Sequence, residues 1–483
     1  KRRVLQGRQL AQSFTMRSIA AQCAWEGLSE NEVQRTLSSC YEKAISGCRP
    51  SLWIVLSLLL GRTPERLWST SRQIYGNTGT TGEYWRVNKK KIQLVSYLSL
   101  PDFQLDNVDQ QLVEPVYNCL LLPVPKSLIE SLRTVLNAVW ADDISSEDLR
   151  AEFRDCIKKL NSDNNTRLTG NRLAANLHRW LIHAGHIDVV SKRLRGIDAK
   201  VNFKQRYEAN FLGDTRLAYC EYATALLETV DRVDDWQVSD CKPIAFGTHL
   251  RVKDEAICYL FEDLRQRASL SKRSFDGACA FHNRYAMYAY QLLMLASGHR
   301  PVRVPLDTLC SFDAVSQELF ICDKVANRAY DSRTIVLPQV ACQQIDHYLQ
   351  HLSALERRSR RSAPEISSQI QKAIEGTSAL LFRIERNRRN QLVLVPFDPM
   401  HVNRWLEEDW TLPLNWHRHW LRSKLTESKH PHEYIDQLLG HEDDQPPGLS
   451  PFSNLTYAGR KAVAVRIQGY LTELGITPLE GIK

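Results

Sequence analysis

Long hydrophobic runs and closely spaced cysteines are both missing from this sequence. The longest apolar block, Leu52 to Leu60, is too short to cross a bilayer, so we expect no contact with a membrane. The twelve cysteines are scattered and form no CxxC pair, which predicts reduced and mostly buried thiols in a cytoplasmic protein. No zinc-ligand spacing is present either, and we predict neither a metal nor another cofactor.

The excess of positive over negative charge is modest. The chain has 63 lysines and arginines against 55 aspartates and glutamates, a formal net charge of +8, which suits a polyanionic partner. A solvated surface is the simpler explanation of any one basic cluster, whereas four clusters in one chain favour nucleic acid. These clusters are Lys1 to Arg3, Lys89 to Lys91, Arg357 to Arg361, and Arg386 to Arg389.

At 483 residues the chain is long enough for two or three domains, and we predict a mainly α fold with small β-sheet elements, an α+β class. Residues 1–120 read as an accessory α/β segment for DNA binding or assembly, with helical spacing from Arg8 to Ile45 and a strand pattern from Tyr84 to Leu100. Residues 121–235 have helical periodicity and many arginines, which fits a helical DNA clamp and, equally well, an ordinary helical domain. Residues 236–483 form the last predicted domain.

In this last domain, Gly298 is well placed to end a long helical segment in the left-handed conformation and to leave Arg300 just beyond it. Two short strands, Glu318 to Cys322 and Arg333 to Leu337, are predicted next. Lys324 follows the first of them, where a lysine can bend over a ligand or simply solubilise a turn.

The stretch from Leu414 to Tyr457 is crowded with histidines and arginines. His419 and Arg422 stand three residues apart and therefore share one face of a helix. His417 competes with His419, but only His419 makes the three-residue step to an arginine.

A second helical segment, His432 to Leu439, ends at Gly440, which places His441 beyond the helix. A linker rich in proline and glycine follows and predicts a mobile tether before Tyr457. Tyr434 and Tyr470 are the neighbouring tyrosines, and Tyr457 is the one that follows the linker.

Taken in order, these residues resemble the signature of the tyrosine recombinase, or phage integrase, family: an arginine, a lysine on a β-hairpin, HxxR, LGH and a nucleophilic tyrosine. The resemblance covers roughly the last half of the chain, and the helical segment before it lies where the family has its core-binding domain. The chain departs from the family pattern at Arg303, where a glutamate is common, and in the spacing on either side of His441. The matching residues are Arg300, Lys324, His419, Arg422, His441 and Tyr457.

The resemblance implies that the protein cuts and rejoins duplex DNA through a 3′-phosphotyrosyl intermediate, without ATP or metal. Two of the implied roles fit the residue types directly, because the guanidinium groups of Arg300 and Arg422 can stabilise charge on a phosphate. His419 would help Tyr457 to lose its proton, since a protonated phenol is a poor nucleophile.

For the remaining two residues, Lys324 would protonate the departing 5′-hydroxyl. His441 would orient the phosphate or donate a hydrogen bond to it.

We therefore expect a site-specific recombinase that integrates, excises or transposes a mobile element, acts on double-stranded DNA with specific recombination sites and is associated with the nucleoid. A helix predicted from Ala458 to Leu474 could join protomers into a homotetramer on DNA or could pack within its own chain. An accessory DNA-bending or element-encoded protein is a further candidate partner. Two alternatives stay open: a monomeric type IB topoisomerase, and a DNA-binding regulator that has kept the fold and lost catalysis.

Overall fold

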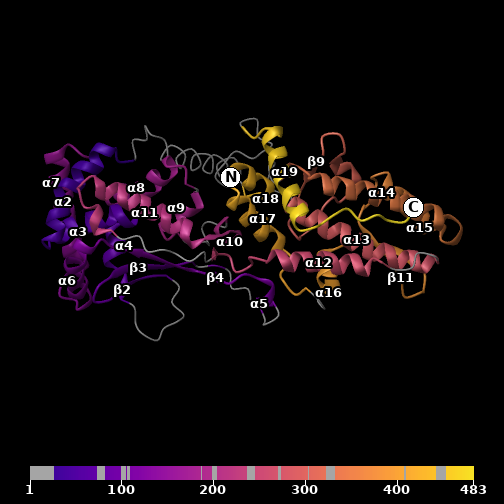
Figure 1. Cartoon of the computed structure of the whole chain (residues 1–483), viewed down its shortest axis with the longest axis horizontal. Coiled ribbons are helices and arrows are strands. Elements are labelled where there is room, and N and C mark those ends of the chain that lie inside the picture. Colours follow the sequence, from indigo (N-terminus) through magenta and orange to yellow (C-terminus); the bar gives the residue numbers. More distant parts are fainter. Residues whose placement is uncertain are drawn as a thin grey trace, which may run out of the picture. The chain divides into compact units, whose positions relative to one another are not determined.

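The structure is a computed structural model, and it describes residues 27–72, 82–98, 100, 105, 109–186, 188–197, 204–236, 245–269, 274–302, 304–322, 332–406, 410–441 and 453–483. The chain divides into two compact units. Unit 1 contains the described residues of 1–101 and 116–248, and unit 2 contains those of 102–115 and 249–483. Helices predominate and four small sheets accompany them among the described residues, which confirms the mixed α+β class (Figure 1).

Unit 1 consists of helices and two small sheets. One sheet has the strand order β1-β2-β3-β5 and the other β4-β7-β6. The helices are α2 (Glu30–Ile45), α3 (Arg49–Leu60), α4 (Pro64–Trp68), α6 (Ile129–Trp140), α7 (Ser146–Asn164), α8 (Gly170–His183), α9 (Asp188–Leu194), α10 (Lys204–Tyr207) and α11 (Leu212–Glu228). The strands are β1 (Ser71–Arg72), β2 (Glu83–Val87), β3 (Ile92–Tyr97), β4 (Val116–Tyr117), β5 (Cys119–Pro123), β6 (Ala209–Phe211) and β7 (Ala245–Gly247).

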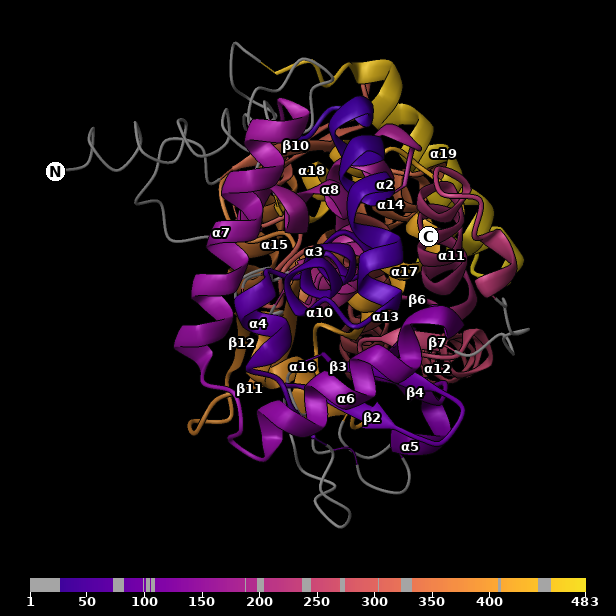
Figure 2. The same cartoon turned by 90° about the vertical axis from the view of Figure 1, so that its left-hand side faces the viewer.

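Helix α3 is the centre of unit 1. It contains the longest apolar block of the sequence, and every residue from Ser51 to Leu60 is buried. A helix that is apolar on all sides has to be covered on all sides, and α3 contacts α2, α7, α8 and α11 (Figure 2). Residues of the predicted segments 1–120 and 121–235 therefore share one hydrophobic core, which includes Trp53 and Tyr222.

Unit 2 contains the segments in which the sequence places the candidate site. Its helices are α5 (Asp109–Leu112), α12 (Asp254–Arg267), α13 (Phe275–Ser297), α14 (Gln339–Ser362), α15 (Pro364–Ile374), α16 (Pro399–Leu406), α17 (Trp416–Glu427), α18 (His432–Leu439) and α19 (Tyr457–Glu473). The strands are β8 (Phe312–Asp313), β9 (Glu318–Ile321), β10 (Arg333–Val336), β11 (Phe382–Arg386) and β12 (Leu392–Pro396). Strands β8, β9 and β10 form one antiparallel sheet, and β11 pairs with β12.

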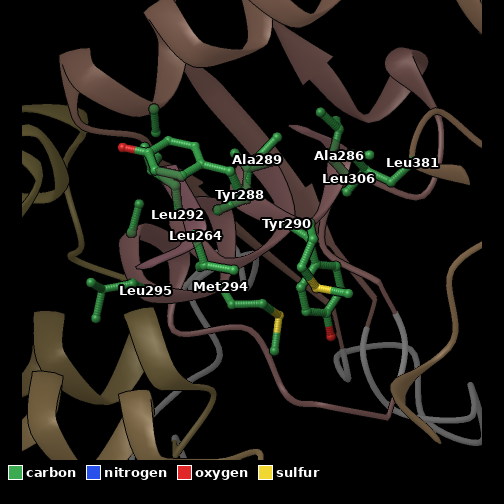
Figure 3. Close-up of a cluster of buried hydrophobic side chains, with 14 of the residues drawn as sticks. Leu264, Ala286, Tyr288, Ala289, Tyr290, Leu292, Met294, Leu295, Leu306 and Leu381 are labelled. Atoms are coloured by element: carbon green, nitrogen blue, oxygen red, sulfur yellow. The ribbon is translucent and has the colours of Figure 1, made fainter. Parts of the chain in front are cut away.

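Helix α13 supplies much of the core of unit 2. All of its residues from Tyr285 to Ser297 are buried, and Figure 3 shows side chains of this helix in one cluster with Leu264, Leu306 and Leu381. The core therefore holds the second half of α13 in place, and this fixes where the following segment begins.

Several local expectations for unit 2 are confirmed. Gly298 follows α13 with a φ of 59°, Gly440 follows α18 with a φ of 64°, and β9 pairs with β10 in the predicted hairpin. Lys324 and Arg303 lie outside the described residues. Among the helices that the structure describes, none has both the length and the apolar content to cross a bilayer.

Candidate functional site

The end of α18 is surrounded by arginines. Three successive carbonyl oxygens, those of Leu438, Leu439 and Gly440, each accept a hydrogen bond from a different arginine. The donors are Arg333 Nε at 2.9 Å, Arg418 Nη2 at 2.6 Å and Arg300 Nη2 at 3.3 Å, respectively. The last carbonyls of a helix have no partner within it, and the negative end of the helix dipole attracts cations, so the fold itself draws these guanidinium groups together.

Two glycines allow this arrangement because their helices end against each other. Gly298 and Gly440 both have left-handed backbone angles, which glycine adopts without the steric cost of a Cβ atom. A Cβ on Gly298 would lie 2.6 Å from Leu439 Cδ2, and one on Gly440 would lie 3.0 Å from Arg333 Nη1. The end of α13, just before Arg300, is thereby packed directly on the end of α18.

Arg422 joins the same group from α17. Its Nη1 donates to Asp436 Oδ1 at 2.8 Å and lies 3.2 Å from His441 Nδ1. All three residues are buried, with Arg422 and His441 fully inaccessible to solvent. The structure therefore brings three of the sequence-predicted residues, Arg300, Arg422 and His441, to one helix end.

Arg418 is a member of this group that sequence reasoning missed. It is fully buried and donates to Gly298 O at 2.6 Å and to Leu439 O, and its Nη2 lies 2.9 Å from His441 Nε2. Its place four residues before Arg422 on one helix face was a signal that could have revealed it. Arg333 and Asp436 were missed as well, and no local pattern marks either one.

His419 lies on the same helix as Arg418 and Arg422 and is buried. Its Nε2 accepts a hydrogen bond from Asn415 Nδ2 at 3.1 Å. Burial, and after it the charge of Arg418, holds the pKa of His419 well below its usual value, so the ring is neutral near pH 7 and is a weaker base than a free imidazole.

His417, the competing histidine, has a different environment. Its Nε2 donates to His299 O at 2.8 Å, and burial lowers its pKa to about 3. The hydrogen bond joins α17 to the segment that follows α13, so His417 has a structural role.

Tyr457 is the first residue of α19, where the side chain of Thr456 caps the helix. The structure thus makes the tyrosine itself part of a helix instead of a mobile tether, while residues 442–452 of the expected linker lie outside the described part of the chain. Its hydroxyl donates to Ser316 O at 2.9 Å, in the turn between β8 and β9. The Tyr457 hydroxyl is therefore bonded to this turn and not to the arginine group.

Of the four basic clusters, three fall in the described residues. Lys89 to Lys91 are all exposed at the turn between β2 and β3, where Arg133 Nη2 donates to Lys89 O at 2.8 Å and to Asn88 O at 3.1 Å. The cluster from Arg357 to Arg361 lies near the end of α14, and the cluster from Arg386 to Arg389 lies in the β11–β12 hairpin. The first cluster, Lys1 to Arg3, is outside the described part of the chain.

No group of histidine, cysteine, aspartate and glutamate side chains suited to a metal ion occurs within the described residues. Comparison of the chain with protein-family models, with curated proteins and with solved structures finds no match. The site is thus defined by its geometry: four guanidinium groups, a buried carboxylate and a buried histidine at one helix end. Guanidinium groups are the usual partners of anions with several oxygen atoms, and of these four only that of Arg300 belongs to a residue that is not buried.

Proposed function

We propose that this protein is a tyrosine-type DNA strand transferase, a site-specific recombinase that cuts and rejoins duplex DNA through a 3′-phosphotyrosyl intermediate. The observation that supports it best is the meeting of Arg300, Arg422 and His441 at the end of α18. Arg300 comes from a segment 140 residues before Gly440, whose carbonyl it contacts. Three of the six motif residues, separated widely in the sequence, therefore lie together in space.

In the proposed reaction, Arg300 and Arg422 stabilise the charge that builds up on the phosphate oxygens when the phosphorus is attacked. The Tyr457 oxygen forms the new bond to phosphorus and the bond to the 5′-oxygen breaks. His419, whose ring is neutral, takes the phenolic proton, which needs the lowered pKa of its ring to rise when the negatively charged phosphate binds, and Lys324 gives a proton to the departing 5′-oxygen. Attack by a 5′-hydroxyl on the phosphotyrosyl bond reverses each transfer and rejoins the strand.

The reaction requires the Tyr457 hydroxyl to leave Ser316 O, since the phosphate would lie at the arginine group, and it requires the buried guanidinium group of Arg422 to become accessible. The described state is accordingly a resting state of the proposed enzyme.

The proposed partner is double-stranded DNA with specific recombination sites, bound by a homotetramer. Val463, Ile467 and Leu471 of α19 are buried in the core of their own unit in this structure. Assembly through α19 would therefore need either an exchange of this helix between protomers or its exposed side, where Val465 is 63% accessible.

A DNA-binding regulator without catalysis is the second candidate. The contact of Tyr457 with Ser316 and the pairing of Arg422 with Asp436 favour it, because both engage groups that the reaction needs. In this reading the arginine group stabilises the helix end and has no chemical role.

A covalent-capture experiment separates the two candidates. The protein would be incubated with nicked duplex fragments from the DNA that flanks its own gene, and any protein–DNA adduct would be mapped to its nucleotide and its tyrosine. We expect an adduct at Tyr457 that is absent in Tyr457→Phe and present in Tyr434→Phe, with noncovalent DNA binding unchanged in both. Binding without any adduct would support the regulator, and relaxation of supercoils by a monomer would indicate a topoisomerase.

A further inference from the structure

Strand β12 has an open edge. Among the described strands it pairs with β11 alone, and the ladder continues into the turn, where Asn387 N donates to Gln391 O at 2.8 Å. This bond fixes the alternation of the antiparallel ladder, so the N–H and C=O groups of Val393, two residues further on, also point towards β11. Those of Leu392 and Leu394 point the other way, and no group among the described residues bonds to them.

The opposite edge of the same hairpin is closed. Ile384 of β11 directs its backbone groups away from β12, and Asn283 of α13 satisfies both of them. The Ile384 N–H donates to Asn283 Oδ1 at 2.8 Å, and its carbonyl accepts from Asn283 Nδ2 at 2.9 Å. Helix α15 contacts β12, yet none of its groups bonds to Leu392 or Leu394. The chain thus completes one edge and leaves the other able to accept a further strand.

The side chains of β12 alternate between two faces of the hairpin. Leu392 and Leu394 pack against the core of unit 2, whereas Val393 and Val395 lie on the other face. All four residues are partly exposed. An apolar strand with an open edge is a usual place for pairing with another chain.

We propose that the open edge of β12 pairs with β12 of a second copy of this chain, antiparallel and about a two-fold axis at Val393. In this register Leu392 lies opposite Leu394 of the second copy and exchanges two hydrogen bonds with it, and the symmetry repeats the pair on the other side of the axis. Pro396 has no N–H group and ends the ladder.

Charge favours a second copy as the occupant of this edge. The two-fold pairing brings the turn that carries Arg388, which is exposed, beside Asp398 of the second copy. The Asp398 side chain is 54% accessible, and its contact with Arg383 is 3.8 Å long. One sequence thus supplies both halves of a charge contact at each end of the paired strands, which is the self-complementarity that a two-fold interface requires. As one contact of the proposed homotetramer, the pairing rests on the proposed function.

Amide hydrogen exchange resolved to single residues tests the pairing in the unmodified protein. At low protein concentration the N–H groups of Leu392 and Leu394 should exchange at least about tenfold faster than those of Val393 and Val395, and at high concentration they should become slow. Slow exchange at both concentrations would show that the chain itself covers the edge, and fast exchange at both would exclude the second copy. Protection that appears only with added DNA would assign the edge to DNA instead.

Disulfide trapping tests the position of the axis. The two copies of Val393 would face each other with Cα atoms about 4.5 Å apart, within the range of a disulfide. Val395 is the matched control, because it lies on the same face and its two copies would be about 14 Å apart. Under mild oxidation, Val393→Cys should form at least about tenfold more linked dimer than Val395→Cys or the unmodified protein. Equal amounts in the two variants would overturn the proposal.

A charge reversal tests the register further. In Val393→Cys, the added change Arg388→Glu should reduce the linked dimer about threefold, because two carboxylates would then meet at each end. Arg361→Glu, at an exposed position of α14, should leave it unchanged. Equal effects of the two changes would overturn the register. Trapping needs neither DNA nor strand cleavage, so the pairing can fail while recombination is observed, and it can hold while no DNA is cleaved.

Discussion

The hydroxyl of Tyr457 donates a hydrogen bond to the backbone carbonyl of Ser316, 141 residues earlier in the chain. The start of α19 is thereby held against the β8–β9 turn. One helical turn further on, Arg460 strengthens the attachment: its Nη1 lies 2.7 Å from Glu318 Oε1 and donates to Thr334 O at 3.1 Å. The candidate nucleophile is thus held by the sheet next to the site.

Removal of this attachment should loosen the first turn of α19. We expect Arg460→Ala to speed amide hydrogen exchange in that turn about fivefold, which corresponds to about 1 kcal/mol, the usual contribution of such contacts. Exchange measured by mass spectrometry over residues 457–466 checks this. Arg466→Ala removes the same charge from an exposed position of α19 and should have no effect on the first turn. Equal exchange in all three proteins would show that Arg460 does not hold the helix start.

The pairing of Arg422 with Asp436 should be costly to break. Both side chains are almost fully buried, and Asp436→Asn would leave a guanidinium group in the core without its carboxylate. We expect a loss of about 3–5 kcal/mol in the free energy of unfolding, measured with urea.

The matched control for Asp436→Asn is Asp254→Asn, because Asp254 pairs with Lys424 of the same helix, α17, and has a side chain that is 43% accessible. That exposed pair should contribute only about 0–1 kcal/mol. Similar losses in the two variants would contradict the prediction.

The contact between the two helix ends predicts a steric effect at Gly298. Gly298→Ala should cost about 1–2 kcal/mol for its left-handed backbone and about 1–3 kcal/mol more for the clash with Leu439. Gly475 has a similar φ of 67° and no atom within 4 Å of a Cβ, so Gly475→Ala isolates the backbone contribution. Thermal unfolding of both variants measures the difference, and equal losses would show that the helix ends do not pack closely.

Acid should destabilise unit 2 through its buried histidines. Burial lowers the pKa of His417 to about 3 and that of His282 to about 4, below the value of about 6.5 in an unfolded chain. The unfolded state therefore binds more protons below about pH 6.5. The stabilisation is fully present above that pH and decreases by about 1.4 kcal/mol per pH unit for each such histidine as the pH falls.

His417→Gln tests this dependence, because the glutamine amide can still donate to His299 O and does not titrate. Urea unfolding between pH 7 and pH 5 should show a slope smaller by up to about 1.4 kcal/mol per pH unit in this variant. His183→Gln, on the exposed end of α8, should keep the slope of the unmodified protein. An unaltered slope in His417→Gln would mean that His417 does not titrate in this way.

The lysines at the β2–β3 turn provide a test of DNA binding by unit 1. Replacement of Lys89, Lys90 and Lys91 by glutamine should reduce the slope of log K against log salt by up to about 2.7, or about 0.9 for each phosphate contact. Lys158 and Lys159 are exposed on α7, and their replacement should leave the slope unchanged. A slope that does not respond to the turn lysines would remove this surface from the proposed DNA contact.

The features that the sequence predicted well are those that local chemistry determines. Gly298 and Gly440 end helices because a left-handed residue at that point favours glycine, and the β9–β10 hairpin follows from two short β-rich runs. These signals need no knowledge of what packs against them.

Arg418, Arg333 and Asp436 could not be found in the same way. Their roles depend on which helix ends meet, and that is decided by the packing of α13, α17 and α18 in three dimensions. The contact of Tyr457 with Ser316 could not be predicted either, since it joins the start of α19 to a turn that lies 141 residues earlier in the chain.

The arginines at the end of α18 have one further consequence. Three of them, Arg300, Arg333 and Arg418, donate to backbone carbonyls of the helix end, which need a donor whether or not a ligand is present. Positive charge therefore accumulates at this point as a by-product of folding, and a phosphate could be held there without a separate set of binding residues.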